Sequence, residues 1–133
     1  MTVAFYATHA VDGDPRQYIP MNQSMALYQD TVVPIPITAT DESWKRMPPF
    51  FNEGNEGRTR WHWRFDEPQK HQRMMKNLYR LITEVDTAIG NVMKTLEEQG
   101  DLNNTLIIFT TDNGVRILHA DQQCSYRDRH THR

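Results

Sequence analysis

The chain has 133 residues, which is the length of one domain of ordinary size. Its 15 Lys and Arg residues against 17 Asp and Glu give a formal net charge of −2, so the overall charge does not indicate a nucleic-acid partner. The sequence contains neither an apolar run near the roughly 20 residues of a membrane span nor a recognisable signal peptide, and no membrane partner is expected.

Residues 2–7 form a short apolar run that ends at Thr8 and His9. Such a run predicts a buried strand, with His9 at its carboxyl end. A histidine there can bind an anion or move a proton near neutral pH. The alternative is a half-buried histidine that bonds only to backbone. Because the chain opens directly on a core strand, we expect it to begin in the middle of a larger fold.

The stretch from residue 12 to residue 65 shows little periodicity and carries six of the seven prolines. It predicts a long loop with short helical or extended pieces. Within it, residues 32–37 alternate proline with branched residues, which removes amide donors and favours an extended surface segment packed on the body of the fold. A connection of this length is typical of a functional surface, such as a wall that faces a substrate.

Residues 58–64 interleave Arg58, Arg60 and Arg64 with two tryptophans. Arginine and tryptophan together can hold a phosphate or sulfate and stack on a ring. The alternative is packing, in which the tryptophans cover the next helix and the arginines pair with glutamates. The glutamates available for that pairing are Glu53, Glu56 and Glu67. One cluster of this kind in a nearly neutral chain does not indicate a nucleic-acid protein.

Residues 68–99 carry the clearest pattern, with apolar residues at intervals of three and four. These are Met75, Leu78, Leu81, Ile82, Val85, Ile89, Val92, Met93 and Leu96. The spacing predicts one long amphipathic helix that lies across a sheet. Asp66 or Glu67 can cap its start, Pro68 suits its first turn, and Gly100 can end it in the left-handed conformation.

Residues 105–111 form a continuous, β-branched apolar run that predicts a strand buried on both faces, as in the parallel sheet of an α/β fold. Asp112, Asn113 and Gly114 follow it. In such sheets ligands bind beyond the carboxyl ends of strands, so these oxygen donors are candidate ligands of Ca²⁺ or Mg²⁺. Ordinary turn chemistry is the alternative. A right-handed βαβ unit would place His9 and Asp112 at one edge.

Residues 79–114 resemble the sulfatase family. The resemblance lies in Tyr79 and the run from Arg80 to Asp86, in residues 96–100, and in residues 104–114. The start of the chain, from Ala7 through His9 to Arg16, resembles the family segment that carries an active-site histidine, although Thr8 stands where the family usually has proline. The resemblance therefore covers residues 3–114.

The resemblance implies an alkaline-phosphatase-like fold, a mixed α/β sheet between helices, of which this chain would be an incomplete part. It implies hydrolysis of a sulfate ester or sulfamate, with a sulfated small molecule or glycan as the substrate. By the same resemblance, Asp112 and Asn113 match two oxygen ligands of Ca²⁺, and His9 matches a histidine that contacts sulfate or the leaving group. Arg60 and Arg64 are further candidates for substrate binding. Members of the family are often exported.

The formylglycine motif of the family, Cys or Ser followed by any residue, Pro or Ala, Ser and Arg, is absent, and the surroundings of Cys124 do not fit it. Residues 115–133 lack the family pattern and are expected to form an unrelated, disordered tail. Two hypotheses follow. Residues 1–114 are a middle segment of a sulfatase catalytic domain, inactive alone, or the chain is a binding module that holds a sulfated or phosphorylated polymer through residues 58–64.

Overall fold

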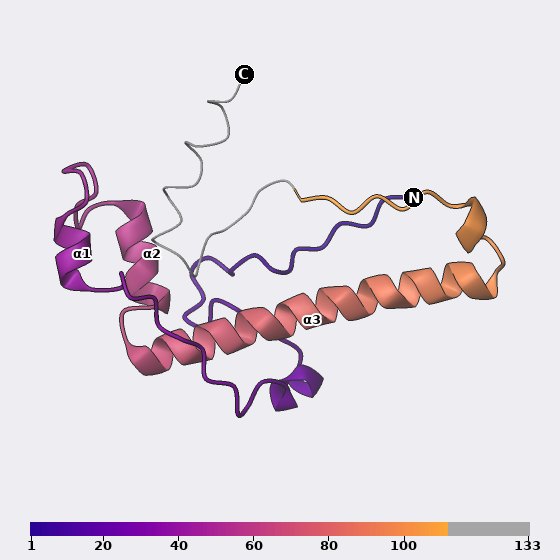
Figure 1. Ribbon diagram of the computed structural model, residues 1–133, viewed down its shortest axis with the longest axis horizontal. Helices are drawn as coiled ribbons and strands as arrows, with labels where there is room; N and C mark the ends of the chain where they lie inside the picture. The colour runs from indigo at the N-terminus through magenta and orange to yellow at the C-terminus, as the bar shows by residue number, and fades with distance from the viewer. Residues whose placement is uncertain (112–133) are drawn as a thin grey trace, which may run out of the picture.

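The structure is a computed structural model that describes residues 1–111, and these residues form helices and extended segments (Figure 1). Figure 1 shows the short helices that precede the long helix gathered near its N-terminal half, whereas the last short helix follows its C-terminal end. In chain order the elements are η1 (Asn22–Ala26), α1 (Asp41–Lys45), α2 (Glu56–Arg64), α3 (Pro68–Glu98) and η2 (Leu102–Asn104).

Helix α3 confirms the long helix predicted from the apolar periodicity, and Pro68 occupies its first turn. At its C-terminal end the amide of Gly100 donates to the Glu97 carbonyl at 3.0 Å, and the amide of Asp101 donates to the Leu96 carbonyl at 2.9 Å. This is the Schellman pattern, and Gly100 adopts the φ of +78° that it requires. Glu67 stands at the N-cap, but its side chain makes no capping bond, so the predicted carboxylate cap is wrong.

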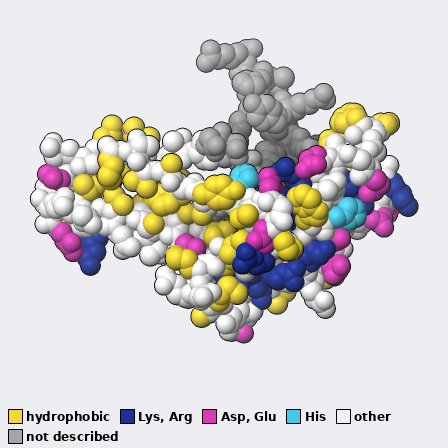
Figure 2. Space-filling view, turned by 180° about the vertical axis from the view of Figure 1, so that it is seen from behind, with side chains coloured by type: hydrophobic (Ala, Val, Ile, Leu, Met, Phe, Trp, Pro, Cys, Tyr) yellow, Lys and Arg dark blue, Asp and Glu magenta, His cyan; other side chains and the backbone are white. Residues whose placement is uncertain are grey.

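The core lies against the first half of α3 only. It consists of Ala10, Tyr18, Val33, Met74, Met75, Leu78 and Leu81. Beyond Leu81 no residue of α3 is buried, and Ile82 and Met93 are 49% and 41% exposed. Figure 2 shows hydrophobic side chains spread over the part of the surface where this second half lies. The wide apolar stripe of α3 is therefore covered over about half of its length.

Two buried polar side chains of α3 attach the loop before it. The Asn77 amide donates to the Tyr18 carbonyl at 3.0 Å, and Arg80 donates to the Asn77 side-chain oxygen at 2.7 Å. Arg80 also donates to the carbonyls of Met25 and Leu27, each at 3.0 Å. Buried polar groups need hydrogen-bond partners. The carbonyl groups of a loop also need donors, because no neighbouring strand supplies them. Asn77 and Arg80 therefore bond to each other and donate to the carbonyls of Tyr18, Met25 and Leu27 in the loop.

The proline-rich stretch forms loops, the two short helices and an extended segment, as predicted. Val33 is buried in that segment, and its backbone exchanges hydrogen bonds with the side-chain amide of Gln72 on α3. Thr40 caps α1 by accepting from the Ser43 amide at 3.2 Å, and Asn55 caps α2. Short polar side chains at these positions satisfy amides that a helix start leaves unpaired.

The predicted α/β fold, an alkaline-phosphatase-like sheet with flanking helices, is contradicted for the described part of the chain. Residues 2–7 and 105–111 were predicted to be buried strands, but Figure 1 shows both as extended traces, and residues 1–111 contain no strand. Leu106 is 85% exposed and Phe109 is 78% exposed. The apolar pattern was present, but a strand forms only where a neighbouring strand accepts and donates its backbone hydrogen bonds.

Candidate functional site

His9 lies at the surface, on the extended segment that leads into the core residue Ala10. Its Nδ1 lies 2.6 Å from the Ala10 carbonyl oxygen, and its ring centroid lies 5.4 Å from that of Tyr6. With Nδ1 at a carbonyl, the proton sits on Nδ1 in the neutral ring and leaves Nε2 as the acceptor. An exposed imidazole held in this way can present Nε2 to a partner outside the segment.

The two predicted Ca²⁺ ligands, Asp112 and Asn113, lie outside the described residues, as does Cys124. The predicted convergence of His9 with Asp112 at one edge stays a prediction. Among residues 1–111, no group of three His, Cys, Asp or Glu side chains is placed to hold a metal ion. A carboxylate and an amide oxygen are the hard donors that Ca²⁺ prefers, but they are two of the six to eight that it takes.

Arg58 is enclosed by aromatic rings rather than open to a ligand. Its guanidinium carbon lies 4.4 Å from the Trp44 ring and 4.3 Å from the Trp61 ring, and its Nε lies 3.2 Å from Glu53. The bond from Arg58 is the main cause that lowers the pKa of Glu53. The Trp44 indole also donates to Glu53, at 3.0 Å. Arg58 therefore fixes α1 against α2, which is the packing interpretation of this residue.

Arg60 and Arg64, the two predicted substrate-binding cations, both face acidic or amide oxygens of their own chain. Arg60 donates to Glu56 at 2.8 Å and lies 3.7 Å from Asp12, and the Glu56 bond raises the pKa of the guanidinium. Arg64 donates to the buried Gln17 at 2.7 Å and lies 4.0 Å from Asp12. The two arginines thus tie the loop around Asp12 to α2, and their charges are largely compensated.

The predicted pairing of the cluster with three glutamates is confirmed for Glu53 and Glu56 and is wrong for Glu67. Glu67 lies 3.9 Å from Lys70 instead. His62 lies 3.4 Å from both Glu53 and Asp66, and Lys70 also pairs with Asp66. Residues 58–64 are therefore embedded in a network of carboxylates, which leaves little uncompensated charge for a polyanion.

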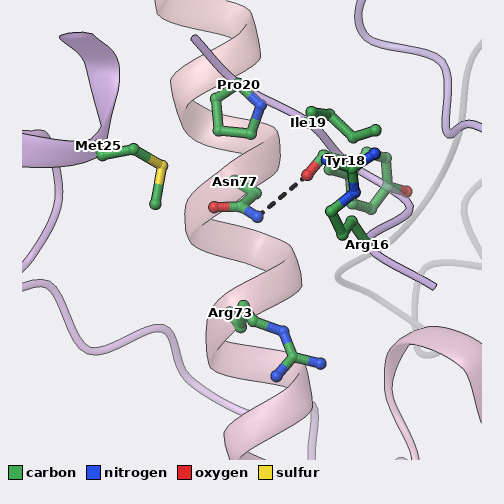
Figure 3. Close-up of a pocket in the computed structure, with 7 residues that line it drawn as sticks. All are labelled: Arg16, Tyr18, Ile19, Pro20, Met25, Arg73 and Asn77. Atoms are coloured by element: carbon green, nitrogen blue, oxygen red, sulfur yellow. Dashed lines mark hydrogen bonds between the residues drawn. The ribbon is translucent and has the colours of Figure 1, made fainter. Parts of the chain in front are cut away.

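Sequence reasoning missed a different pair of arginines, Arg16 and Arg73, which line a hollow beside α3 together with Tyr18 and Asn77 (Figure 3). A signal for one side of it was present, because Arg73 and Asn77 stand four residues apart on one face of a predicted helix. Arg16 lies 57 positions earlier, on the loop, and only the tertiary structure brings it to this face.

A family model described as Sulfatase matches residues 1–132. An arylsulfatase of Klebsiella aerogenes is 29% identical over 101 residues, which is 75% of this chain and 18% of that protein. A multifunctional alkaline phosphatase superfamily protein, PehA of Trinickia caryophylli, is 49% identical over 37 residues, which is 28% of this chain and 7% of that protein. No solved structure matches the chain.

The family model covers nearly the whole length of the chain. The chain belongs to the sulfatase family. The predicted resemblance is therefore confirmed, although the chain spans less than a fifth of the length of the curated relatives it matches. The boundary predicted at residue 114 stays a prediction. No helix within residues 1–111 has the length and apolar character needed to cross a bilayer.

Proposed function

We propose that this chain supplies a segment of a sulfuric ester hydrolase domain, and that residues 1–114 carry part of its divalent-metal and sulfate site. The match of the sulfatase family over residues 1–132 carries this proposal. The substrate class is a sulfate ester of a small molecule or a glycan. The Klebsiella aerogenes relative is an arylsulfatase, which supports the ester part of this assignment.

In the proposed site, Asp112 and Asn113 contribute two oxygen ligands to Ca²⁺. When bound, the ion stabilises negative charge on the sulfate oxygens. His9 contacts the sulfate or the leaving group and acts as the imidazolium, which keeps Nδ1–H on the Ala10 carbonyl and donates the Nε2 proton to the departing alkoxide. The exposed position of His9 is compatible with this role, because its ring can meet a substrate held by chain outside residues 1–111.

The chain alone is expected to be inactive, because the formylglycine motif that supplies the nucleophile is absent from its sequence. The alternative of a binding module for a sulfated or phosphorylated polymer needs uncompensated cations in residues 58–64. Arg58, Arg60 and Arg64 already face carboxylates or amides, so this alternative is not favoured. Arg60 and Arg64 remain candidates for substrate contact only if a sulfate displaces Asp12.

A chimera tests the proposal. Residues 1–114 replace the matching segment of the Klebsiella aerogenes arylsulfatase, and hydrolysis of a chromogenic aryl sulfate is measured. We expect the chimera to hydrolyse the ester, and Asp112→Ala and Asn113→Ala each to lower kcat/KM by about a hundredfold or more, since a bound metal ion stabilises the transition state by several kcal/mol and each 1.36 kcal/mol is a factor of about ten. His9→Ala should lower kcat more than it raises KM.

The matched control is Asn104→Ala, a polar residue of η2 outside the proposed site, which should leave kcat/KM unchanged. Melting curves confirm that each chimera is folded before its rate is compared. An active chimera that keeps its rate after Asp112→Ala would refute the metal assignment. Turnover by the isolated chain that survives Cys124→Ala would refute the statement that it lacks a nucleophile.

A further inference from the structure

A hollow of about 200 Å³ lies between α3 and the loop before η1. Its lining residues are Arg16, Tyr18, Ile19, Pro20, Met25, Arg73 and Asn77. In the view of Figure 3, Arg16 and Arg73 lie to one side of Asn77 and Met25 lies to the other. Ile19 lies beside Arg16 in the same view, so cationic and apolar side chains line the hollow together, with a buried amide among them.

The shape of the hollow is fixed by hydrogen bonds beneath it. The Asn77 amide donates to the Tyr18 carbonyl at 3.0 Å, and Asn77 in turn accepts from the buried Arg80. Tyr18 itself is 4% exposed and belongs to the core. A ligand would thus meet walls that are already in place, which reduces the entropy cost of binding.

The charges of the hollow do not cancel. Arg16 donates to Asp14 through Nε at 3.0 Å and through Nη2 at 2.6 Å, and this pairing lowers the pKa of Asp14 to about 2, so the pair is neutral overall. Arg73 has no hydrogen bond or ion pair within the described part of the chain. By contrast, Arg46, Arg58, Arg60 and Arg64 each have a carboxylate within 4.0 Å.

The local formal charge is therefore +1, and it stands beside three apolar side chains. We propose that this hollow binds an organic monoanion, with its anionic group at Arg73 and its ring or alkyl part on Ile19, Pro20 and Met25. Guanidinium groups bind both carboxylates and sulfo groups through paired N–H donors. The expected ligand therefore carries either a planar carboxylate or a tetrahedral sulfo group on an apolar ring or chain. The inference uses residues 14–77 alone and does not depend on sulfate hydrolysis.

Met25 offers a direct readout, because photoexcited benzophenones react readily with methionine side chains. The full chain is irradiated with benzophenone-4-carboxylate, and labelled peptides are quantified by mass spectrometry. We expect Met25 to be labelled about tenfold more than by neutral benzophenone, since a charge-assisted bond contributes about one decade in affinity. Met21, which is 51% exposed and outside the hollow, serves as an internal reference.

Arg73→Gln should lower the labelling of Met25 about tenfold and leave that of Met21 unchanged. The matched control Arg46→Gln removes another exposed arginine and should change neither. Asp14→Asn raises the local charge to +2 and should increase the labelling. A benzophenone sulfonate used in parallel shows whether a sulfo group binds as well as a carboxylate does.

Three results would overturn the inference. Equal labelling of Met25 by the neutral and anionic probes would mean that the hollow binds apolar groups without using its charge. Unchanged labelling after Arg73→Gln would remove the assigned anion contact. A loss after Arg46→Gln as large as that after Arg73→Gln would indicate nonspecific attraction to the surface. Far-ultraviolet circular dichroism of each variant confirms that α3 is intact.

Discussion

His71 is a buried residue whose polar atoms have no partner. The side chain is 4% exposed, both ring nitrogens lack a hydrogen bond within the described structure, and the ring centroid lies 5.9 Å from that of Phe65. A buried donor or acceptor without a partner costs about 1–3 kcal/mol. We therefore expect His71→Leu to stabilise the folded part of the chain at pH 7 by about 1 kcal/mol. Urea unfolding followed at 222 nm measures this difference.

The same burial makes the stability depend on pH. Desolvation lowers the pKa of His71 below its ordinary value of 6.5, so the unfolded chain binds a proton before the folded chain does. Below pH 6.5 the free energy of unfolding should fall by up to about 1.4 kcal/mol per pH unit, and this part of the loss should vanish in His71→Leu. Parallel losses in both proteins between pH 7.5 and pH 5.5 would contradict the explanation.

At Asp112 and Asn113 the chain offers two oxygen ligands to an ion that takes six to eight. We therefore expect no tight Ca²⁺ site in the isolated chain, with any dissociation constant weaker than about 10⁻³ M. Isothermal titration calorimetry with Ca²⁺ measures it, and Asp112→Ala is the control. Micromolar binding that Asp112→Ala abolishes would mean that further ligands, not identified in the sequence, complete the site.

The helices and the predicted strands differ in how much of their structure is local. Helix α3 could be predicted because its hydrogen bonds, its apolar spacing and its glycine end all lie within one stretch of chain. Residues 105–111 have an equally clear apolar pattern, but a strand takes its partners from elsewhere. The carboxylates Glu53 and Glu56 could be predicted as partners of Arg58 and Arg60 because they lie four or five residues away in the sequence. The position of Arg16 and Arg73 on the same hollow could not be predicted, because 57 residues separate them.

Gly90 and Gly100 have opposite roles in α3. Gly90 lies inside the helix, and a Cβ added there would meet nothing within 4 Å. Glycine costs about 1 kcal/mol relative to alanine in a helix interior, so Gly90→Ala should stabilise α3 by about that amount. Gly100 has a φ of +78°, where a side chain is strained, so Gly100→Ala should destabilise by about 1 kcal/mol.

Thermal melts of the two alanine variants, followed at 222 nm, check this prediction. A rise for Gly90→Ala and a fall for Gly100→Ala are expected. If Gly90→Ala also lowers the melting temperature, the surface at Gly90 is in contact with another part of the protein or with another molecule, and the helix is not open there.

For the whole molecule, the main feature is that only half of α3 has a core against it. Residues 10–33 cover α3 up to Leu81, while the apolar side chains farther along the helix are exposed or half-buried. The chain spans 18% of the arylsulfatase that it matches, so most of the chain that such a protein has is absent from this sequence. Packing against further chain would explain why the stripe continues to Leu96.

The extended apolar segment 105–111 should therefore make the isolated chain poorly soluble. Leu106, Ile108 and Phe109 are 85%, 76% and 78% exposed, and an exposed run of large apolar side chains, including a β-branched and an aromatic one, is typical of segments that pair with one another between molecules. We expect a sedimentation pattern with large species, and circular dichroism in which α3 persists longest on heating. Ile108→Lys should raise the soluble fraction severalfold, because a charge blocks edge-to-edge pairing of strands.

The matched control is Ile37→Lys, which adds the same charge at another isoleucine that is 84% exposed and lies outside the segment. If both variants become soluble to the same degree, the net charge is the cause and not the segment. If the unaltered chain sediments as a monomer with one sharp, cooperative melt, the exposed segment does not drive association, and residues 1–133 fold as a unit without further chain. Loss of aggregation in Ile108→Lys alone would place the first intermolecular contact within residues 105–111.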